Sequence, residues 1–294
     1  MEKQDFETKI KKMFKEFCEV LEIKEPEENI KKLVTYIMTD GTRTSTTLDE
    51  KDAYMDGSKF TERFIQIAKI VGCRDCYVNV FEEFHQTRGN YPKIYAALLG
   101  VVPVWKEFTT KNNIKLKFVG NFTNPINPPG LNEDLRVHLQ KLEELTEKND
   151  FGTYVFINFS RDWAEQNRHL FKDWPTINTV IRFTKGLSAP ESMWLPGKIR
   201  YESLIYVQQG SSSMNWSDRQ LTFLIALALR AMTKNTPFYA KSGYDEKDKE
   251  RIRELREREA VFINKDFYNK KLDDEKPAKV AMIFTEVGPE RYKF

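Results

Sequence analysis

The sequence has few cysteines and few histidines, three of each among 294 residues. Three cysteines exclude a disulfide framework, which needs several paired thiols. Cys73 and Cys76 have the spacing of a redox or half-zinc motif, but the histidines show no metal-ligand spacing that would complete a zinc site. We therefore interpret these two cysteines as small apolar residues at the start of a strand.

The sequence also lacks a long apolar run and an excess of either charge. Its longest apolar stretch, residues 221–232, contains Arg230 and falls short of the roughly twenty residues that span a membrane, so we expect a buried helix there. With 47 basic and 44 acidic residues the formal net charge is +3, which predicts no broad attraction to nucleic acid. Residues 1–28 mix lysine and glutamate without an apolar core, so we expect neither a secretory signal nor a transit peptide and place the protein in the cytoplasm.

From Asn29 onward, short β-branched runs alternate with longer amphipathic stretches. This order is typical of strands joined by crossover helices, and short apolar strands are typical of a parallel sheet covered on both faces. The pattern predicts an α/β fold with a mainly parallel sheet of about six strands flanked by helices. The expected strands are 33–38, 75–81, 115–119, 153–159, 179–183 and 203–207, and the expected helices are 58–71, 91–112, 132–148, 162–171 and 217–233. Within 91–112, Pro103 either bends the helix or ends it so that a second one starts.

The loop after the first expected strand carries the residues with the clearest chemistry. Ligands of open α/β sheets bind at the carboxyl ends of the strands, which is where this loop begins. Asp40 could hold Mg²⁺, Gly41 would let the backbone approach a ligand closely, and Arg43 could bind a phosphate group. An ordinary turn uses the same residues, so the chemistry alone leaves both interpretations open.

Residues 37–43 (IMTDGTR) resemble the first signature of the cis-prenyltransferases, the undecaprenyl diphosphate synthase family, in which a strand ends in an aspartate-glycine-asparagine turn followed by an arginine. Here Thr42 stands in place of the asparagine. Further segments are similar to later parts of that family and follow in its order. These segments are 75–85, 117–121 with 139–148 and 155–162, and 179–182 with 201–206 and 215–216. The resemblance covers roughly residues 29–232 and depends on the order and spacing of short motifs.

The resemblance implies a hydrophobic tunnel beside the sheet and an enzyme that condenses isopentenyl diphosphate with an allylic diphosphate, using Mg²⁺. Such an enzyme must stabilise the departing pyrophosphate and shield a carbocation-like centre from water. The resemblance also implies a homodimer, or a heterodimer with a homologous subunit, and transient contact with the membrane surface when the product is long.

Site residues follow from the resemblance position by position. Asp40 matches the catalytic, metal-associated aspartate, and Glu202 lies one position from a metal-associated glutamate. His85 replaces an asparagine that follows the second strand, which makes it a candidate active-site residue. The expected diphosphate-binding residues are Gly41, Thr42, Arg43, Arg182 and Arg200, and the expected tunnel residues are Phe60, Phe64, Ile67 and Leu98. Helical spacing also suits the tunnel residues to an ordinary core, and Arg182 to a pair with a neighbouring carboxylate.

The sequence departs from the family pattern after Arg182, where the glycine pair and a second arginine are missing and the nearby cations are Lys185, Lys198 and Arg200. A lysine neutralises phosphate but does not reproduce a bidentate arginine. Three functions therefore stay open. The first is a prenyltransferase that elongates a chain or carries out an atypical coupling or cyclisation. The others are a non-catalytic subunit of a heteromeric cis-prenyltransferase and an α/β protein that binds an unrelated phosphate compound.

Three parts are expected along the chain: an N-terminal helical extension at 1–28, a cis-prenyltransferase-like catalytic domain at 29–235 and a charged C-terminal extension at 236–294. In the extension, acidic and basic residues are interleaved from Lys241 to Arg258. Such a pattern suits an exposed helix with a narrow apolar stripe.

Overall fold

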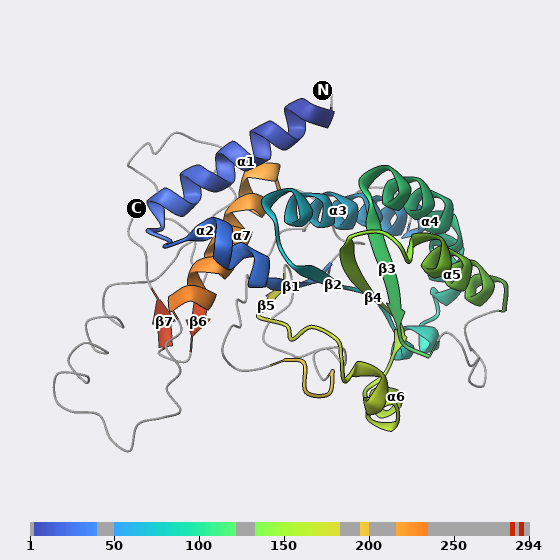
Figure 1. Ribbon diagram of the computed structural model, residues 1–294. Helices are drawn as coiled ribbons and strands as arrows, with labels where there is room; N and C mark the ends of the chain where they lie inside the picture. Colours follow the sequence, from blue (N-terminus) through green and yellow to red (C-terminus); the bar gives the residue numbers. More distant parts are fainter. Residues whose placement is uncertain are drawn as a thin grey trace, which may run out of the picture.

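The computed structural model describes residues 3–39, 50–121, 133–182, 195–199, 216–234, 283–285 and 288–290. Five strands form one fully parallel sheet in the order β3-β4-β2-β1-β5 (Figure 1). The strands are β1 (Val34–Met38), β2 (Asp75–Glu82), β3 (Ile114–Val119), β4 (Phe151–Phe159) and β5 (Thr179–Arg182). The predicted parallel α/β sheet is confirmed, while the sixth expected strand, 203–207, lies outside the described residues.

Both faces of the sheet are buried, as the apolar strands predict. Along β1 the side chains alternate: Ile37 belongs to the hydrophobic cluster on one face, and Tyr36 and Met38 belong to the cluster on the other. All five residues of this strand are buried. The period of two and the apolar character on both sides are what a central parallel strand requires.

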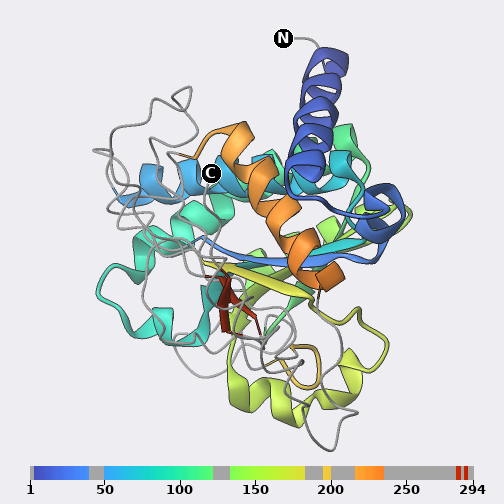
Figure 2. The ribbon, with the colours of Figure 1, turned by 90° about the vertical axis from the view of Figure 1, so that its left-hand side faces the viewer.

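Helices cover the two faces unequally (Figures 1 and 2). One face carries a layer that contains α1 (Lys3–Val20), α3 (Glu50–Val71), α4 (Tyr91–Asn112) and α7 (Asp218–Lys234). The other face is covered by α6 (Arg161–Gln166), and α5 (Glu133–Thr146) packs beside β3 and α4. Shorter elements are α2 (Pro26–Asn29), the 3-10 turns Ile30–Lys32, Glu83–Thr87 and Arg168–Phe171, and a hairpin of β6 (Ile283–Thr285) and β7 (Gly288–Glu290).

Two expected helices differ from their predicted bounds by more than two residues. The helix expected at 58–71 begins already at Glu50, and the one expected at 162–171 divides into α6 and a separate 3-10 turn. Helix α4 continues through Pro103, so the chain does not stop and restart there. Its end is fixed by α3, because the Lys69 ammonium donates to the carbonyls of Asn112 and Asn113. A cation at this position also matches the negative end of the helix dipole.

Helix α7 is buried on all sides, since every residue from Gln220 to Ala231 is buried. It begins with a reciprocal cap, in which the Ser217 backbone N–H donates to Gln220 Oε1 at 2.8 Å and the Gln220 N–H donates to Ser217 Oγ at 3.3 Å. Helix α1 packs along it, with the Phe17 and Phe223 rings 5.0 Å apart. The prediction of a buried helix here is confirmed. Among the described helices, none is both long and apolar enough to cross a membrane.

The two neighbouring cysteines are core residues, as interpreted from the sequence. Cys73 is 5 % exposed and Cys76 is 0 % exposed, and both are free thiols. Burial raises the pKa of Cys76 to about 12. A thiol of this kind stays protonated and unreactive at neutral pH.

Asp75, at the start of β2, is a charged group that the fold partly buries. Its carboxylate lies over Gly152 on β4, where an added Cβ would be 2.2 Å from Oδ1. Burial raises the pKa of Asp75 to about 6, although the nearby Arg74, with its Nε 3.3 Å from Oδ2, works in the opposite direction. Because the folded-state pKa lies above the unfolded value, the folded protein binds more protons between about pH 4 and pH 6. The contribution of Asp75 to the free energy of unfolding is therefore most favourable below about pH 4 and decreases as the pH rises from about 4 to 6.

We expect Asp75→Asn to be more stable than the wild type at pH 7.5 by about 1–3 kcal/mol, because it removes a partly buried charge. The advantage should shrink towards pH 4, where the wild-type carboxyl is protonated. Urea denaturation at both pH values measures this, with the exposed Asp173→Asn as the matched control. An equal pH dependence in wild type and Asp75→Asn would contradict the assignment.

Candidate active site at the carboxyl edge of the sheet

The topology marks the carboxyl ends of β2 and β4 as the place where a ligand is expected. These strands are neighbours in the sheet, but β2 leads to α4 on one face and β4 leads to α6 on the other (Figure 1). Where adjacent parallel strands diverge to opposite faces, the chain leaves a gap between their ends, which is the usual ligand position in open α/β sheets. The carboxyl end of β1, which is followed in the sequence by Asp40, lies beside the carboxyl end of β2.

The backbone is irregular at this edge. The pairing of β2 with β4 shifts register between Asn79 and Glu82. Gly120, just after β3, has φ +143°, and a Cβ there would be 1.8 Å from the Ile157 carbonyl oxygen. Asn158, near the end of β4, has φ +53°, in the left-handed region. Bulges and positive φ values redirect side chains, and they concentrate at functional sites.

Asn158 is the centre of a buried amide cluster that joins three elements. Its Oδ1 accepts a hydrogen bond from the Gln86 amide, and its Nδ2 donates to the Asn121 carbonyl at 3.3 Å. The Asn121 backbone N–H donates back to the Asn158 carbonyl at 3.1 Å. The side-chain amide of Asn121 is itself buried, and neither of its polar atoms has a hydrogen-bond partner in the described part of the chain. The ends of β3 and β4 and the turn after β2 are thereby held together by polar groups.

Glu82 places a carboxylate at the end of β2 with only 2 % of the residue exposed. The Asn79 amide donates to its Oε1 at 3.0 Å, and its side chain also accepts the backbone N–H of His85. In return, the Glu82 backbone N–H donates to His85 Nδ1 at 3.0 Å. This reciprocal cap makes Nδ1 the acceptor, so the neutral imidazole carries its proton on Nε2.

The oxygen atoms at this edge are of the kind that Mg²⁺ binds. Asn79 Oδ1 is buried and has no hydrogen-bond partner in the described part of the chain. Among the described residues there is no group of three or more histidine, cysteine, aspartate or glutamate side chains that could hold a metal ion. Mg²⁺ nevertheless commonly uses one or two carboxylates together with substrate phosphates and water. The donor set at this edge therefore fits the ion.

The structure places two of the sequence-predicted site residues at this edge. Arg182 ends β5 beside Met38 of β1 and is 4 % exposed, and His85 lies in the turn after β2. Since β1 lies between β2 and β5, these two residues are on either side of the strand that leads to Asp40. The predicted residues Asp40, Gly41, Thr42, Arg43, Arg200 and Glu202 lie outside the described residues.

The predicted tunnel residues are all buried in the larger hydrophobic cluster. Phe60, Phe64 and Ile67 come from α3, and Leu98 comes from α4, the two helices that cover this face of the sheet. Their role as a tunnel wall stays a prediction. Lys198, one of the cations near the missing second arginine, donates to the carbonyls of Lys172 at 2.9 Å and Trp174 at 2.7 Å. At least two hydrogen bonds of the Lys198 ammonium are therefore made to backbone carbonyls of this chain.

Four residues at this edge were not predicted from the sequence as site residues: Glu82, Gln86, Asn121 and Asn158. The available signal was weak: polar residues stand at the ends of expected strands, one of them directly after Gly120. The order of residues in the sequence does not show that β2 and β4 are neighbours in the sheet. The amide cluster between them could therefore not be predicted from the sequence.

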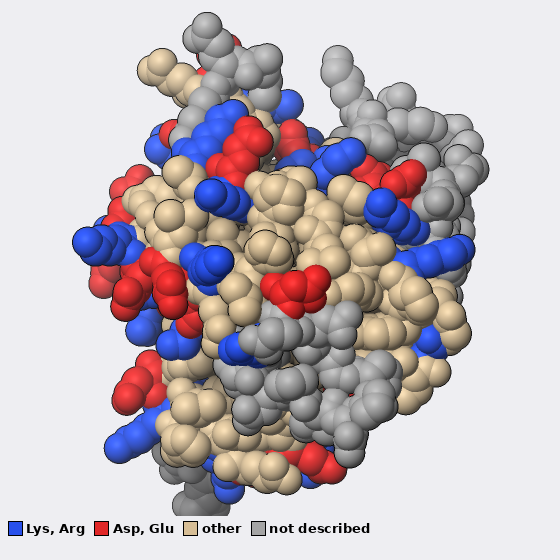
Figure 3. All heavy atoms as spheres, turned by 90° about the vertical axis from the view of Figure 1, so that its right-hand side faces the viewer, with Lys and Arg blue, Asp and Glu red and all other residues tan. Residues whose placement is uncertain are grey.

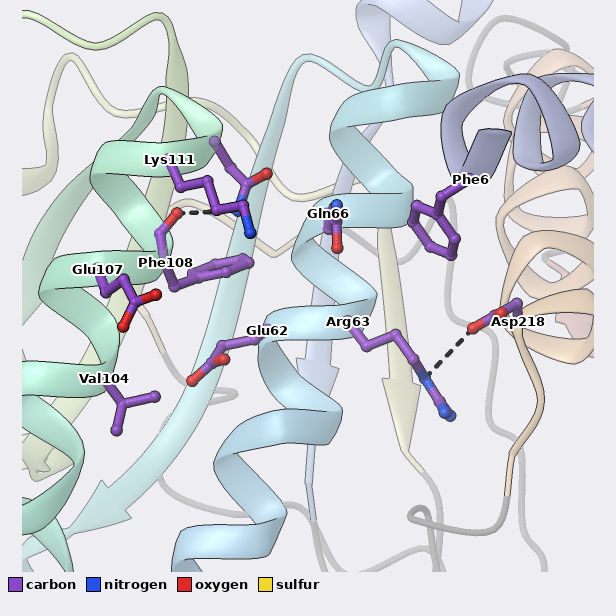
Figure 4. Close-up of a pocket in the computed structure, with 10 residues that line it drawn as sticks. Phe6, Glu62, Arg63, Gln66, Val104, Glu107, Phe108, Lys111 and Asp218 are labelled. Carbon is purple, nitrogen blue, oxygen red and sulfur yellow. Dashed lines mark hydrogen bonds and ion pairs between the residues drawn. The ribbon is translucent and has the colours of Figure 1, made fainter. Parts of the chain in front are cut away.

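A separate pocket of about 610 Å³ lies in the helical layer, away from the strand ends (Figure 4). Helices α3 and α4 form most of its wall, with Glu62 and Gln66 from the first and Glu107 and Phe108 from the second. Arg63 crosses towards α7, where its Nε is 3.5 Å from Asp218 Oδ1. Helix α3 thus presents polar residues to this pocket and apolar residues to the core.

The side of the molecule shown in Figure 3 has no charge of one sign gathered over its described residues. Lysine and arginine are mixed with aspartate and glutamate around its margin, and much of the middle is uncharged.

Comparisons with known proteins identify the fold. No protein-family model matches the sequence, and no curated protein matches it. Solved structures do match. One is a lavandulyl diphosphate synthase from Lavandula x intermedia in complex with dimethylallyl diphosphate, with a TM-score of 0.55 and 12 % identity, covering 67 % of this chain and 94 % of that one. Another is a probable undecaprenyl diphosphate synthase from Campylobacter jejuni, with a TM-score of 0.51 and 13 % identity, covering 71 % and 98 %. Both are cis-prenyltransferase-fold proteins, which confirms the resemblance at the level of the fold.

We expect Gly120→Ala to destabilise the protein by at least about 3 kcal/mol, because a side chain at this positive φ would meet the Ile157 carbonyl. Gly89→Ala is the matched control, since no atom lies within 4 Å of its added Cβ, and it should change stability by less than about 0.5 kcal/mol. Urea denaturation compares the two. Similar urea midpoints for the two variants would show that Gly120 does not lie close to the Ile157 carbonyl.

Proposed function

Because the chain has the cis-prenyltransferase fold, we propose that it is a prenyltransferase that acts on an allylic isoprenyl diphosphate with Mg²⁺ and releases pyrophosphate. One observation carries the proposal: buried polar residues stand at or near the carboxyl ends of β2, β4 and β5, which lie at the same edge of the sheet as the end of the strand that leads to Asp40. The complex of one structural neighbour with dimethylallyl diphosphate supports the substrate class.

In the proposed reaction, the chain must hold the diphosphate while its bond to the allylic carbon breaks. The phosphate oxygens would be bound by the backbone at Gly41 and by the guanidinium groups of Arg43 and Arg182. Each guanidinium can make bidentate contacts, which a lysine cannot. Asp40 and Glu202 would hold Mg²⁺, which supplies positive charge to the leaving group. His85, protonated at Nε2, can donate a hydrogen bond to the departing oxygen.

The prenyl chain needs an environment that excludes water from the cationic carbon. Phe60, Phe64, Ile67 and Leu98 belong to the apolar layer formed by α3 and α4 over the sheet. In the proposal these side chains line a tunnel that starts at the carboxyl edge. Apolar walls leave no nucleophile beside the allylic centre except the intended acceptor.

The proposed enzyme also has an acceptor substrate, a domain organisation and an oligomeric state that the sequence predicts. The acceptor is isopentenyl diphosphate in chain elongation, or a second prenyl group in a coupling or cyclisation if the altered segment after Arg182 no longer binds it. Residues 29–235 form the catalytic domain, flanked by the extensions 1–28 and 236–294. The enzyme is a cytoplasmic homodimer or heterodimer that contacts the membrane surface transiently.

The deciding experiment is Mg²⁺-dependent turnover of a panel of radiolabelled allylic diphosphates, each with and without isopentenyl diphosphate. Product that requires isopentenyl diphosphate supports elongation, and product from the allylic diphosphate alone supports coupling or cyclisation. If neither condition yields product but a homologous subunit restores activity, the chain is a non-catalytic subunit instead.

We expect Asp40→Asn to lower the turnover rate at least about a hundredfold, because it removes negative charge from the metal-binding loop. Asp56→Asn is the control, since Asp56 forms an ion pair with Lys59 on the surface of α3. Unchanged turnover in Asp40→Asn would refute the proposed role of this loop.

We expect Arg182→Lys to raise the KM for the diphosphate it binds by about ten- to a hundredfold while kcat changes less, because the charge remains and the bidentate contact is lost. The exposed Arg168→Lys, which alters an ion pair with Glu165, should leave both constants unchanged. Steady-state kinetics with each substrate varied in turn measure the effect. If no KM changes, Arg182 has a structural role only.

A further inference from the structure

The His85 imidazole makes several contacts within its own segment of the chain. The Glu82 backbone N–H donates to Nδ1 at 3.0 Å. The imidazole also lies beside the rings of Phe81 and Phe84, whose centroids are 5.5 Å and 4.2 Å away. These contacts orient the imidazole relative to the 3-10 turn Glu83–Thr87. Because such a short turn has few hydrogen bonds of its own, its place relative to the sheet depends on contacts with other strands.

Gln86 connects this turn to β4. It is the buried residue of the turn, at 8 % exposure, and its Nε2 donates to Asn158 Oδ1, which is 72 residues away in the sequence. Asn158 is held in turn by the end of β3, because its Nδ2 donates to the Asn121 carbonyl at 3.3 Å and its own carbonyl accepts the Asn121 backbone N–H at 3.1 Å. The turn that carries His85 is therefore tied to the paired ends of β3 and β4.

A bulge in β4 brings the Asn158 amide to this turn. Two consecutive residues of β2 pair with Ile157 and Phe159, so Asn158 between them is an extra residue on β4. Its φ of +53° lies in the left-handed region, which asparagine adopts more readily than most residues. Ile157 and Phe159 accordingly belong to clusters on opposite faces of the sheet, although regular alternation would put them on the same face. The bulge thus takes the amide out of the regular pattern and aims it at the turn after β2.

From these contacts we propose that Gln86 and Asn158 are positioning residues for His85. The bulge in β4 presents an acceptor to the turn after β2, and the hydrogen bond from Gln86 holds the turn, and with it the imidazole, at a fixed place on the carboxyl edge. A displacement of about 1 Å at a reacting group can lower a rate about a hundredfold, so this anchor affects the reaction without touching the substrate. The role of the imidazole towards an allylic diphosphate rests on the proposed function.

An amide cluster that only stabilises the strand ends would not act through His85. Gln86→Met keeps the length of the side chain but removes the donor. Asn158→Gly removes the acceptor, and the bulge remains because glycine tolerates the positive φ. Gln140→Met is the matched control, since it makes the same substitution on α5, where Gln140 Oε1 accepts from Arg136. Each variant loses one or two hydrogen bonds and should stay folded, which circular dichroism checks.

NMR of the imidazole groups in the full-length protein measures the position directly, because the sequence has three histidines. His85→Phe removes the His85 signals and so assigns them. At about pH 8, above the usual pKa of histidine, the wild type and the control should show a neutral His85 ring protonated at Nε2. In Gln86→Met and Asn158→Gly the His85 signals should shift or broaden, while those of the other two histidines stay unchanged. His85 signals that are the same as in the wild type in both variants overturn the proposal.

Turnover provides a second measurement. We expect Gln86→Met to lower kcat by about ten- to a hundredfold while the KM for the allylic diphosphate changes less than about threefold, because the anchor does not contact the substrate. In the His85→Phe background the same substitution should change kcat by less than about twofold, since no imidazole is left to position. Equal losses of kcat in the two backgrounds show that Gln86 does not act through His85 and overturn the proposal.

The positioning role and the proposed function can fail separately. His85 signals that depend on Gln86 and Asn158, in a protein that converts no prenyl diphosphate, support the positioning role and refute the function. Mg²⁺-dependent turnover in a protein whose His85 signals are unaffected by both substitutions supports the function and refutes the positioning role.

Discussion

The parallel pairing of β2 with β4 is the constraint on which the rest of the structure depends. It makes neighbours of two strands whose following helices lie on opposite faces of the sheet, which is the arrangement that marks a ligand position in open α/β sheets. The irregular register at the end of this pair places Glu82 and Asn158 at the same edge. Without this pairing, the Glu82 carboxylate and the amide cluster would have no common location.

Helix α3 shows how one element serves two surfaces. Its inner side contributes Phe64 and Ile67 to the core over the sheet, and its outer side contributes Glu62 and Arg63 to the pocket in the helical layer. Ser58 joins the two sides, because it accepts a hydrogen bond from the buried Trp105 indole at 2.7 Å and donates to Glu62 at 3.0 Å. Burial raises the pKa of Glu62, and the neighbouring Glu107 adds to this effect. Helix α3 therefore has an apolar side over the sheet and a polar side at the pocket.

The carboxyl edge departs from the rules that govern the rest of the sheet. Elsewhere the strands bury mainly apolar side chains and a few threonines, but here the chain buries a carboxylate and three amides and uses positive φ at Gly120 and Asn158. Such features lower the stability of the folded protein unless a bound ligand offsets the loss, and they are kept where a function requires them. Their concentration at one edge is the reason to look for the chemistry there, and the apolar layers on both faces supply the stability that tolerates them.

Local patterns in the sequence were enough for the strands, most of the helices and the parallel sheet, because β-branched runs and helical spacing are short-range properties of the chain. His85 and Arg182 were predicted as site residues from the resemblance to the cis-prenyltransferases, and both lie at the carboxyl edge of the sheet. Glu82, Gln86, Asn121 and Asn158 were decided by the tertiary structure alone. Their roles depend on which strands are adjacent, on a shift of register and on hydrogen bonds between residues as far apart as Gln86 and Asn158. Such long-range pairing follows from packing the whole sheet, and no window of the sequence contains it.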